Sequence, residues 1–165
     1  MIISIQREKL IDPLKQMVGV SEKKQTMPIL GNVLLRSGGG SLLLVASDLE
    51  VEVSTSISHE TEDKVDTTLP ARKLLDILKS LPGSDLVKIE VNETKAVIKS
   101  GKSKFTLATL PGSEFPYKEE TNEFKFTVSA LDLDSLIGQT GFSMATQDAR
   151  HFLNGMFLEV SKNKL

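Results

Sequence analysis

The stretch KVDTTLPARKLLDILKSLP, residues 64–82, sets the pattern for the chain. Val65, Thr67 and Leu69 alternate with their neighbours, as in a half-buried strand. Pro70 suits the first turn of a helix, where its missing N–H would have no partner. The apolar residues that follow recur at helical spacing and form one stripe: Leu74, Leu75, Ile77, Leu78 and Leu81. Pro82-Gly83 then ends the helix. The stretch therefore predicts a strand that runs directly into an amphipathic helix.

The same strand–helix unit is predicted twice more, at residues 1–20 and 124–142. Leu10 matches Leu133, and LGNVLL at 30–35 matches LNGMFL at 153–158, both at an offset of 123 residues. Chance matching of apolar residues could produce either match alone. One offset shared without a gap instead indicates a repeat at domain length, with a half-length repeat inside it.

Three strands are predicted after each of the first two helices: residues 32–37, 41–47, 50–58, 86–91, 96–100 and 104–110. Gly38-Gly39-Gly40 is predicted to be a hairpin turn, since it lacks the following helix and Lys of a phosphate loop. Pro13 predicts a kink or an early end of regular hydrogen bonding in the first helix. The expected fold class is α+β, with helices on one face of antiparallel sheet and pseudo-twofold internal symmetry.

Residues 111–123, PGSEFPYKEETNE, mark a boundary because they combine Pro, Gly and charged residues with few apolar ones. We therefore expect a first domain at 1–123 and the truncated start of a second at 124–165. The second would supply a strand, a helix and another strand at 153–160. Such a piece buries its apolar faces poorly, which predicts a fragment of a longer protein or a natural truncation.

The composition limits the possible chemistry. The 165 residues are 39% hydrophobic, carry a net charge of −2 and include no Cys, which excludes disulfides and thiol chemistry. No basic leader or bilayer-length apolar run is present, so we expect a cytoplasmic protein.

His59 and His151 lack metal-ligand spacing, and Asp132 and Asp134 follow Ser129 as in a capped helix start. We therefore expect no cofactor, no metal and no catalytic residue, and an enzyme is the weaker class.

Five stretches, taken together, resemble one known family: TMPILGNVLL (26–35), SDLEVEV (47–53), TTLPARKLLDILKSLP (67–82), KSGKSKFTLATLPGSEFP (99–116) and FSMATQDARHFLNGMFLE (142–159). They resemble the bacterial sliding clamps, the β subunits of DNA polymerase III. The resemblance implies three similar domains per protomer and a head-to-tail homodimeric ring around duplex DNA, with helices lining the hole. It also implies a non-enzymatic processivity factor for DNA replication. Polymerase and clamp-loader subunits would bind it through short peptide motifs. We expect no membrane partner.

The resemblance also implies DNA-contact residues. Candidates in the first two helices are Lys9, Lys15, Arg72, Lys73 and Lys79, although ordinary solvated helix faces would look the same. The loop after the first helix places Lys24 at a family DNA contact, and Gln147 matches it at the offset of 123. Some relatives have an aromatic pair where this chain has His151-Phe152, which leaves a DNA contact by His151 open.

The remaining family sites are present in part. The ring-closing interface maps to Lys73, Ile77, Leu81, Lys102, Lys104, Phe105 and Leu107. Lysines that merely protect an exposed sheet edge would give the same pattern. Arg150 corresponds to one residue of the pocket that receives partner peptides. Two other functions stay open: a protein-interaction module derived from a clamp domain without ring formation, and an enzyme whose site shows no motif.

Overall fold

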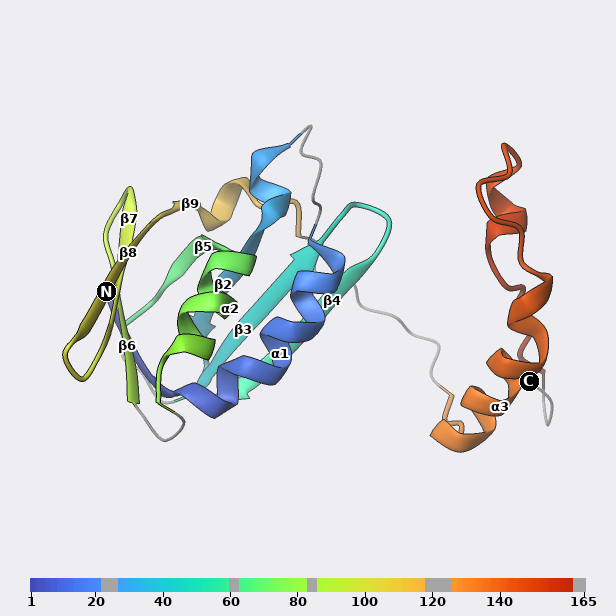
Figure 1. The fold of residues 1–165 in the computed structure, drawn as a ribbon, viewed down its shortest axis with the longest axis horizontal. Coiled ribbons are helices and arrows are strands. Elements are labelled where there is room, and N and C mark those ends of the chain that lie inside the picture. The colour runs from blue at the N-terminus through green and yellow to red at the C-terminus, as the bar shows by residue number, and fades with distance from the viewer. Residues whose placement is uncertain (22–26, 60–62, 83–85, 118–125, 162–165) are drawn as a thin grey trace. The chain divides into compact units, whose positions relative to one another are not determined.

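The computed structural model describes residues 1–21, 27–59, 63–82, 86–117 and 126–161 (Figure 1). The chain divides into two compact units, Met1–Glu119 and Glu120–Leu165, which we call unit 1 and unit 2. The expected domain boundary after residue 123 lies outside the described residues and stays a prediction.

Unit 1 consists of two halves, each with a strand, a helix and three further strands, and the second half adds a short fourth strand; this confirms the predicted α+β class. The first half contains β1 (Ile2–Gln6), α1 (Arg7–Val20), the 3-10 turn η1 (Pro28–Gly31), β2 (Asn32–Gly38), β3 (Ser41–Ser47) and β4 (Glu52–Ser58). The second contains β5 (Asp66–Pro70), α2 (Ala71–Ser80), β6 (Leu86–Val91), β7 (Lys95–Ser100), β8 (Ser103–Ala108), β9 (Leu110–Pro111) and η2 (Gly112–Glu114).

Two local expectations about proline need correction. α1 continues past Pro13 to Val20, so the predicted early end is wrong. A proline removes one helical hydrogen bond, whereas the buried face of α1 (Leu10, Ile11, Leu14 and Met17) holds the helix in place. Pro70 takes the N-cap position of α2, one residue before the predicted first turn.

The two halves exchange their first strands. One sheet has the order β1-β6-β7-β8 and the other β4-β3-β2-β5-β9, and every neighbouring pair is antiparallel. β1 of the first half therefore pairs with β6 of the second, where Ile3 lies opposite Ile89. β5 of the second half pairs with β2 of the first. Neither half completes its sheet without the other.

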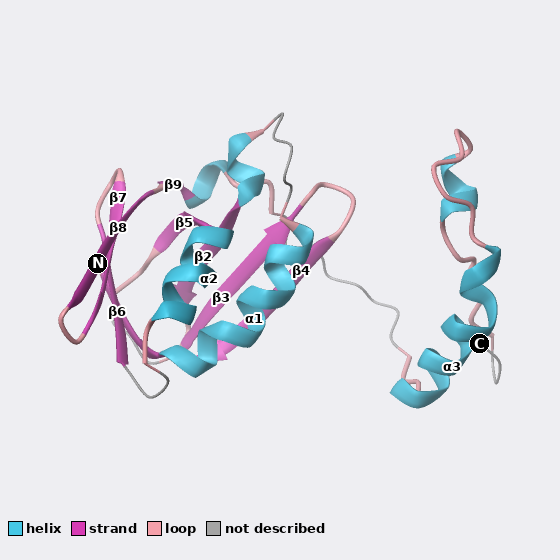
Figure 2. Ribbon diagram, viewed as in Figure 1, coloured by secondary structure: helices cyan, strands magenta, loops and turns pink. Residues whose placement is uncertain are grey.

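α1 and α2 lie side by side and cover one face of the β4-β3-β2-β5-β9 sheet (Figure 2). Their apolar stripes enter a single core with inward-facing residues of both sheets, including Ile3, Val33, Leu44, Ile89 and Ile98. The opposite face of the larger sheet carries a smaller cluster formed by Ile29, Leu30, Leu34, Val45 and Phe115. Positive φ angles of 58° and 78° at Gly39 and Gly40 form the predicted β2–β3 hairpin turn.

The end of unit 1 is fastened to β5. β9 pairs with β5, and the Thr68 hydroxyl donates to the Leu110 carbonyl at 3.1 Å. On the same strand, Asp66 accepts from Arg36 Nε at 3.0 Å. A Cβ at Gly112 would collide with the Asp66 carboxylate and lie 2.9 Å from its backbone carbonyl carbon. Glycine is therefore needed here for close approach to β5.

Unit 2 contains the predicted helix as α3 (Ala130–Thr140), followed by the 3-10 turns η3 (Gly141–Ser143) and η4 (His151–Asn154). The predicted strand at 153–160 is wrong, because these residues finish η4 and then continue as irregular chain. Residues 126–129 are not a strand either. A strand needs a hydrogen-bonded neighbour, and no described strand of unit 2 supplies one. Ser129 occupies the N-cap of α3, but its hydroxyl makes no capping hydrogen bond.

The strand exchange can be tested with two neighbouring isoleucines on β1. Ile3 is 0% exposed and Ile2 is 39% exposed. We expect Ile3→Ala to lower the free energy of unfolding of unit 1 by about 2–5 kcal/mol, since it leaves a cavity in the shared core. Ile2→Ala should change it by less than about 1 kcal/mol. Denaturant unfolding followed by circular dichroism measures both. Equal effects of the two variants would contradict the described position of β1.

Candidate functional site

The exposed faces of α1 and α2 carry an excess of basic side chains. The two helices expose five Lys and Arg against three Asp and Glu, whereas the whole chain has a net charge of −2. All five basic residues predicted on these helices are exposed: Lys9, Lys15, Arg72, Lys73 and Lys79. Because the helices pack together, the structure brings these residues into one surface, which we call the helix layer.

The repeat relates the charges of the helix layer to one another. Lys9 and Lys73, like Lys15 and Lys79, are separated by 64 residues, as are the buried Leu10 and Leu74. Equivalent lysines therefore occupy equivalent positions on neighbouring helices.

Most of these cations are free to interact. Lys15 Nζ lies 2.8 Å from Asp12 Oδ1. Within the described part of the chain, no ion pair occupies the other four: Lys9, Arg72, Lys73 and Lys79. Arg7 faces inward instead, and its Nε donates to the Leu78 carbonyl at 2.6 Å, which joins α1 to α2.

The other two DNA-contact candidates lie elsewhere. Lys24 falls outside the described residues. Gln147 lies exposed in a turn of unit 2, where its φ of 60° is left-handed. Only the five helix residues are therefore brought together by the described structure.

The predicted interface residues gather at one sheet edge and the adjoining helix. β8 is the last strand of the β1-β6-β7-β8 sheet, and Lys102 and Lys104 are exposed there. The apolar members of the set belong to, or pack against, the core: Ile77, Leu81, Phe105 and Leu107. Exposed lysines thus surround an edge whose apolar side chains are already largely covered.

A charged group that the sequence analysis missed lies behind this edge. Lys88, Lys99 and Lys104 stand opposite one another across β6, β7 and β8. Glu90 lies among them, 2.6 Å from Lys99 Nζ and 4.0 Å from Lys88 Nζ. The hydrogen bond from Lys99, with the charges of Lys99, Lys88 and Lys104, holds the pKa of Glu90 below its ordinary value. Charged residues alternating along two neighbouring strands were the available signal.

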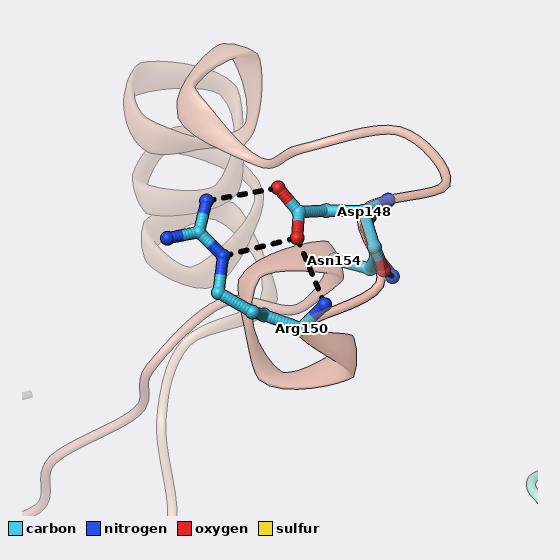
Figure 3. A network of polar contacts seen from close by, with 3 residues as sticks. All are labelled: Asp148, Arg150 and Asn154. Carbon is cyan, nitrogen blue, oxygen red and sulfur yellow. Dashed lines mark hydrogen bonds and ion pairs between the residues drawn. The ribbon is translucent and has the colours of Figure 1, made fainter.

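In unit 2 a polar network surrounds Arg150 (Figure 3). Asp148 accepts from Arg150 Nε and Nη2, both at 3.1 Å, and from its backbone N–H at 2.8 Å. These bonds lower the pKa of Asp148 and raise the pKa of Arg150. The side chain of Asn154 completes the network by binding the backbone of Asp148.

A hollow of about 650 Å³ is formed by α3 and residues 143–159 of the same unit. Its lining is mainly apolar: Leu133, Leu136, Ile137, Met144, Phe152 and Met156 among others. Arg150, the predicted pocket residue, is not part of this lining.

Among the described residues, no group of three or more His, Cys, Asp or Glu side chains is arranged to hold a metal ion. None of the described helices has the length and apolar character needed to cross a membrane.

Comparison with known proteins gives a consistent result. Residues 1–119 match the family model described as DNA polymerase III beta subunit, N-terminal domain. The chain is 47% identical to the beta sliding clamp of Pseudomonas putida and 37% identical to that of Escherichia coli K12, each over 167 residues. Each alignment covers 100% of this chain but 46% of the relative, so the chain spans about half the length of these relatives.

Solved structures agree with the sequences. A crystal structure of the DNA polymerase sliding clamp from Pseudomonas aeruginosa with ligand superposes with a TM-score of 0.90 at 46% identity, over 98% of this chain and 44% of that chain. A sliding clamp from Bartonella birtlesii bound to griselimycin gives a TM-score of 0.90 at 33% identity, over 99% of this chain and 44% of that one.

The low pKa of Glu90 predicts how this group affects stability. A carboxyl with a lowered pKa in the folded state stabilises the fold above its ordinary value of 4.5, and this contribution disappears as the pH falls through the folded pKa. We expect Glu90→Gln to lower the denaturation midpoint at pH 7 and to have little effect near pH 2. Urea unfolding at the two pH values measures this. A midpoint difference that is the same at both would contradict the assignment.

Proposed function

Since the chain belongs to the family of the DNA polymerase III beta subunit, we propose that it is part of a sliding clamp, which encircles duplex DNA and tethers the replicative polymerase for processive synthesis. The role is non-catalytic and cytoplasmic. The observation in this chain that carries the proposal is the helix layer, a basic surface on a protein of net charge −2.

A clamp must hold DNA and still slide along it. Contacts with phosphates suit this, because they carry no sequence information and weaken as salt rises. Lys9, Arg72, Lys73 and Lys79 offer such contacts, while Asp12 and Asp76 between them limit the strength of binding. Lys24 and Gln147, at equivalent positions of the 123-residue repeat, would extend the same set.

Ring closure would use the edge of unit 1 at β8. The proposed contacts to a second protomer are Lys73, Ile77, Leu81, Lys102, Lys104, Phe105 and Leu107. An unpaired strand edge favours main-chain pairing with a partner strand, and the exposed lysines favour an acidic partner. The full-length protein would then be a homodimer.

Polymerase and clamp-loader subunits are the proposed protein partners, bound through short peptide motifs with Arg150 at the site. The relative from Bartonella birtlesii, which binds griselimycin, supports the ability of this family to hold a ligand.

Charge reversal in the helix layer tests the proposed DNA contact. We expect Arg72→Glu/Lys79→Glu to weaken binding of this chain to a short labelled duplex. The slope of log K against log salt should fall by about 0.9 for each phosphate that the variant no longer neutralises. Fluorescence anisotropy between about 50 and 200 mM salt measures both quantities. The matched control is Lys95→Glu, an exposed reversal on β7. A control that weakens binding as much as the double variant would count against the helix layer.

Topological retention tests the function itself. We expect the protein at the length of its relatives, once loaded, to stay on circular DNA and to leave when the DNA is linearised, because a closed ring has no end to slide off. Gel filtration before and after cutting measures this. Retention that survives linearisation would contradict a ring. Complete absence of retention would favour an interaction module instead.

A further inference from the structure

The network around Arg150 leaves only part of the guanidinium available. Asp148 occupies the side formed by Nε and Nη2 through two bonds of 3.1 Å. A guanidinium has five N–H groups, and among the described residues nothing accepts from the two hydrogens on Nη1 or from the second hydrogen on Nη2. The side chain of Arg150 is 67% exposed, whereas that of Asp148 is 27% exposed. Arg150 therefore presents an exposed edge with three donors that no described residue occupies.

Asp148 is itself held in place. The side-chain oxygen of Asn154 accepts from the backbone N–H of Asp148 at 3.0 Å, and its amide donates to the Asp148 carbonyl at 3.1 Å. Figure 3 shows the Asn154 side chain beside the backbone of Asp148, with the carboxylate directed at Arg150. Asn154 thus holds the backbone of Asp148, and the backbone N–H of Arg150, which donates to Asp148 Oδ1 at 2.8 Å, orients the carboxylate toward the guanidinium.

The pair carries no net charge. Both groups are ionised at neutral pH, and their mutual hydrogen bonds lower the pKa of Asp148 and raise the pKa of Arg150, away from neutrality in each case. An approaching phosphate is therefore attracted by the guanidinium and repelled by the carboxylate close behind it. A neutral carbonyl oxygen is affected much less, since its interaction depends on N–H geometry rather than on net charge.

We propose that Asp148 is a positioning residue that directs Arg150 toward neutral peptide carbonyl groups of a protein partner and away from DNA phosphate. This inference rests on the proposed function, because it assumes that the partner at Arg150 is a peptide. It adds that Asp148 and Arg150, although they follow the DNA-contact candidate Gln147, do not form a phosphate site.

The repeat supports this division. At the offset of 123 residues, Gln147, Asp148 and Arg150 correspond to Lys24, Gln25 and Met27. The sequence of the first repeat thus has a cation at the position of Gln147 and no carboxylate at the position of Asp148. The sequence around Lys24 therefore has the positive charge that a phosphate contact needs. The sequence around Gln147 has instead the neutral Asp148–Arg150 pair that suits a carbonyl contact.

The test uses Asp148→Asn in the full chain, with inorganic phosphate and the uncharged diamide N-acetylglycinamide as probes. Asparagine keeps an oxygen that can accept from the backbone N–H of Arg150 but removes the charge. The readout is the shift of the Arg150 Nε–Hε resonance by NMR. We expect the ratio of the phosphate response to the diamide response to rise several-fold in the variant. A purely structural role of Asp148 would not strengthen phosphate binding.

The matched control is Asp12→Asn, which removes an equal charge beside Lys15 in unit 1. It should leave the Arg150 ratio unchanged. An unchanged ratio in Asp148→Asn, or an equal rise in the control, would overturn the inference. The NMR readout uses no DNA, so it can be separated from the duplex-binding assay described above. Absence of salt-dependent duplex binding would count against the proposed function, whereas the phosphate response in the NMR experiment decides the role of Asp148.

Discussion

Burial of the apolar faces of α1 and α2 in one shared core is the constraint on which unit 1 depends. Four leucines of these faces are fully buried, and they correspond in pairs at a spacing of 64 residues: Leu10 with Leu74, and Leu14 with Leu78. Fully burying one such side chain contributes about 1.5–3 kcal/mol. Because the stripes must face inward, the lysines between them are directed outward on both helices. The core thus determines where the basic surface lies.

Electrostatics in this protein is local rather than global. The net charge alone argues against a nucleic-acid partner. The helix layer nevertheless concentrates basic residues, whose charge is exceeded in the total by the acidic residues of the rest of the chain. On β6 the charge of Glu90 instead offsets part of the repulsion among Lys88, Lys99 and Lys104, because it lies 2.6 Å from Lys99 Nζ and 4.0 Å from Lys88 Nζ. Asp148 offsets the charge of a single arginine, Arg150.

The periodic parts of the fold could be predicted from the sequence. Helical spacing identifies α1, α2 and α3, and alternation identifies the strands of unit 1 except the short β9, whose residues were assigned to the preceding strand and the linker. Strand partners were not predictable in this way, because pairing between β1 and β6 depends on distant residues that leave no local pattern. The strand expected at 153–160 failed for the same reason: its apolar residues favour a strand, but no described neighbour pairs with it. The Arg150 network follows no period, so only the folded chain reveals it. Most site residues came from family resemblance rather than from periodicity.

The exchange of first strands also affects how the chain is made. Ile3 is synthesised before Ile89, 86 residues earlier in the chain, yet the two lie opposite each other in the sheet. At about 5–20 residues per second, synthesis of the intervening chain takes roughly 4–17 s. During that interval β1 has no native partner, and its apolar face is a target for chaperones. β1 is therefore made well before β6, but it can take its place in the sheet only after β6 has been synthesised.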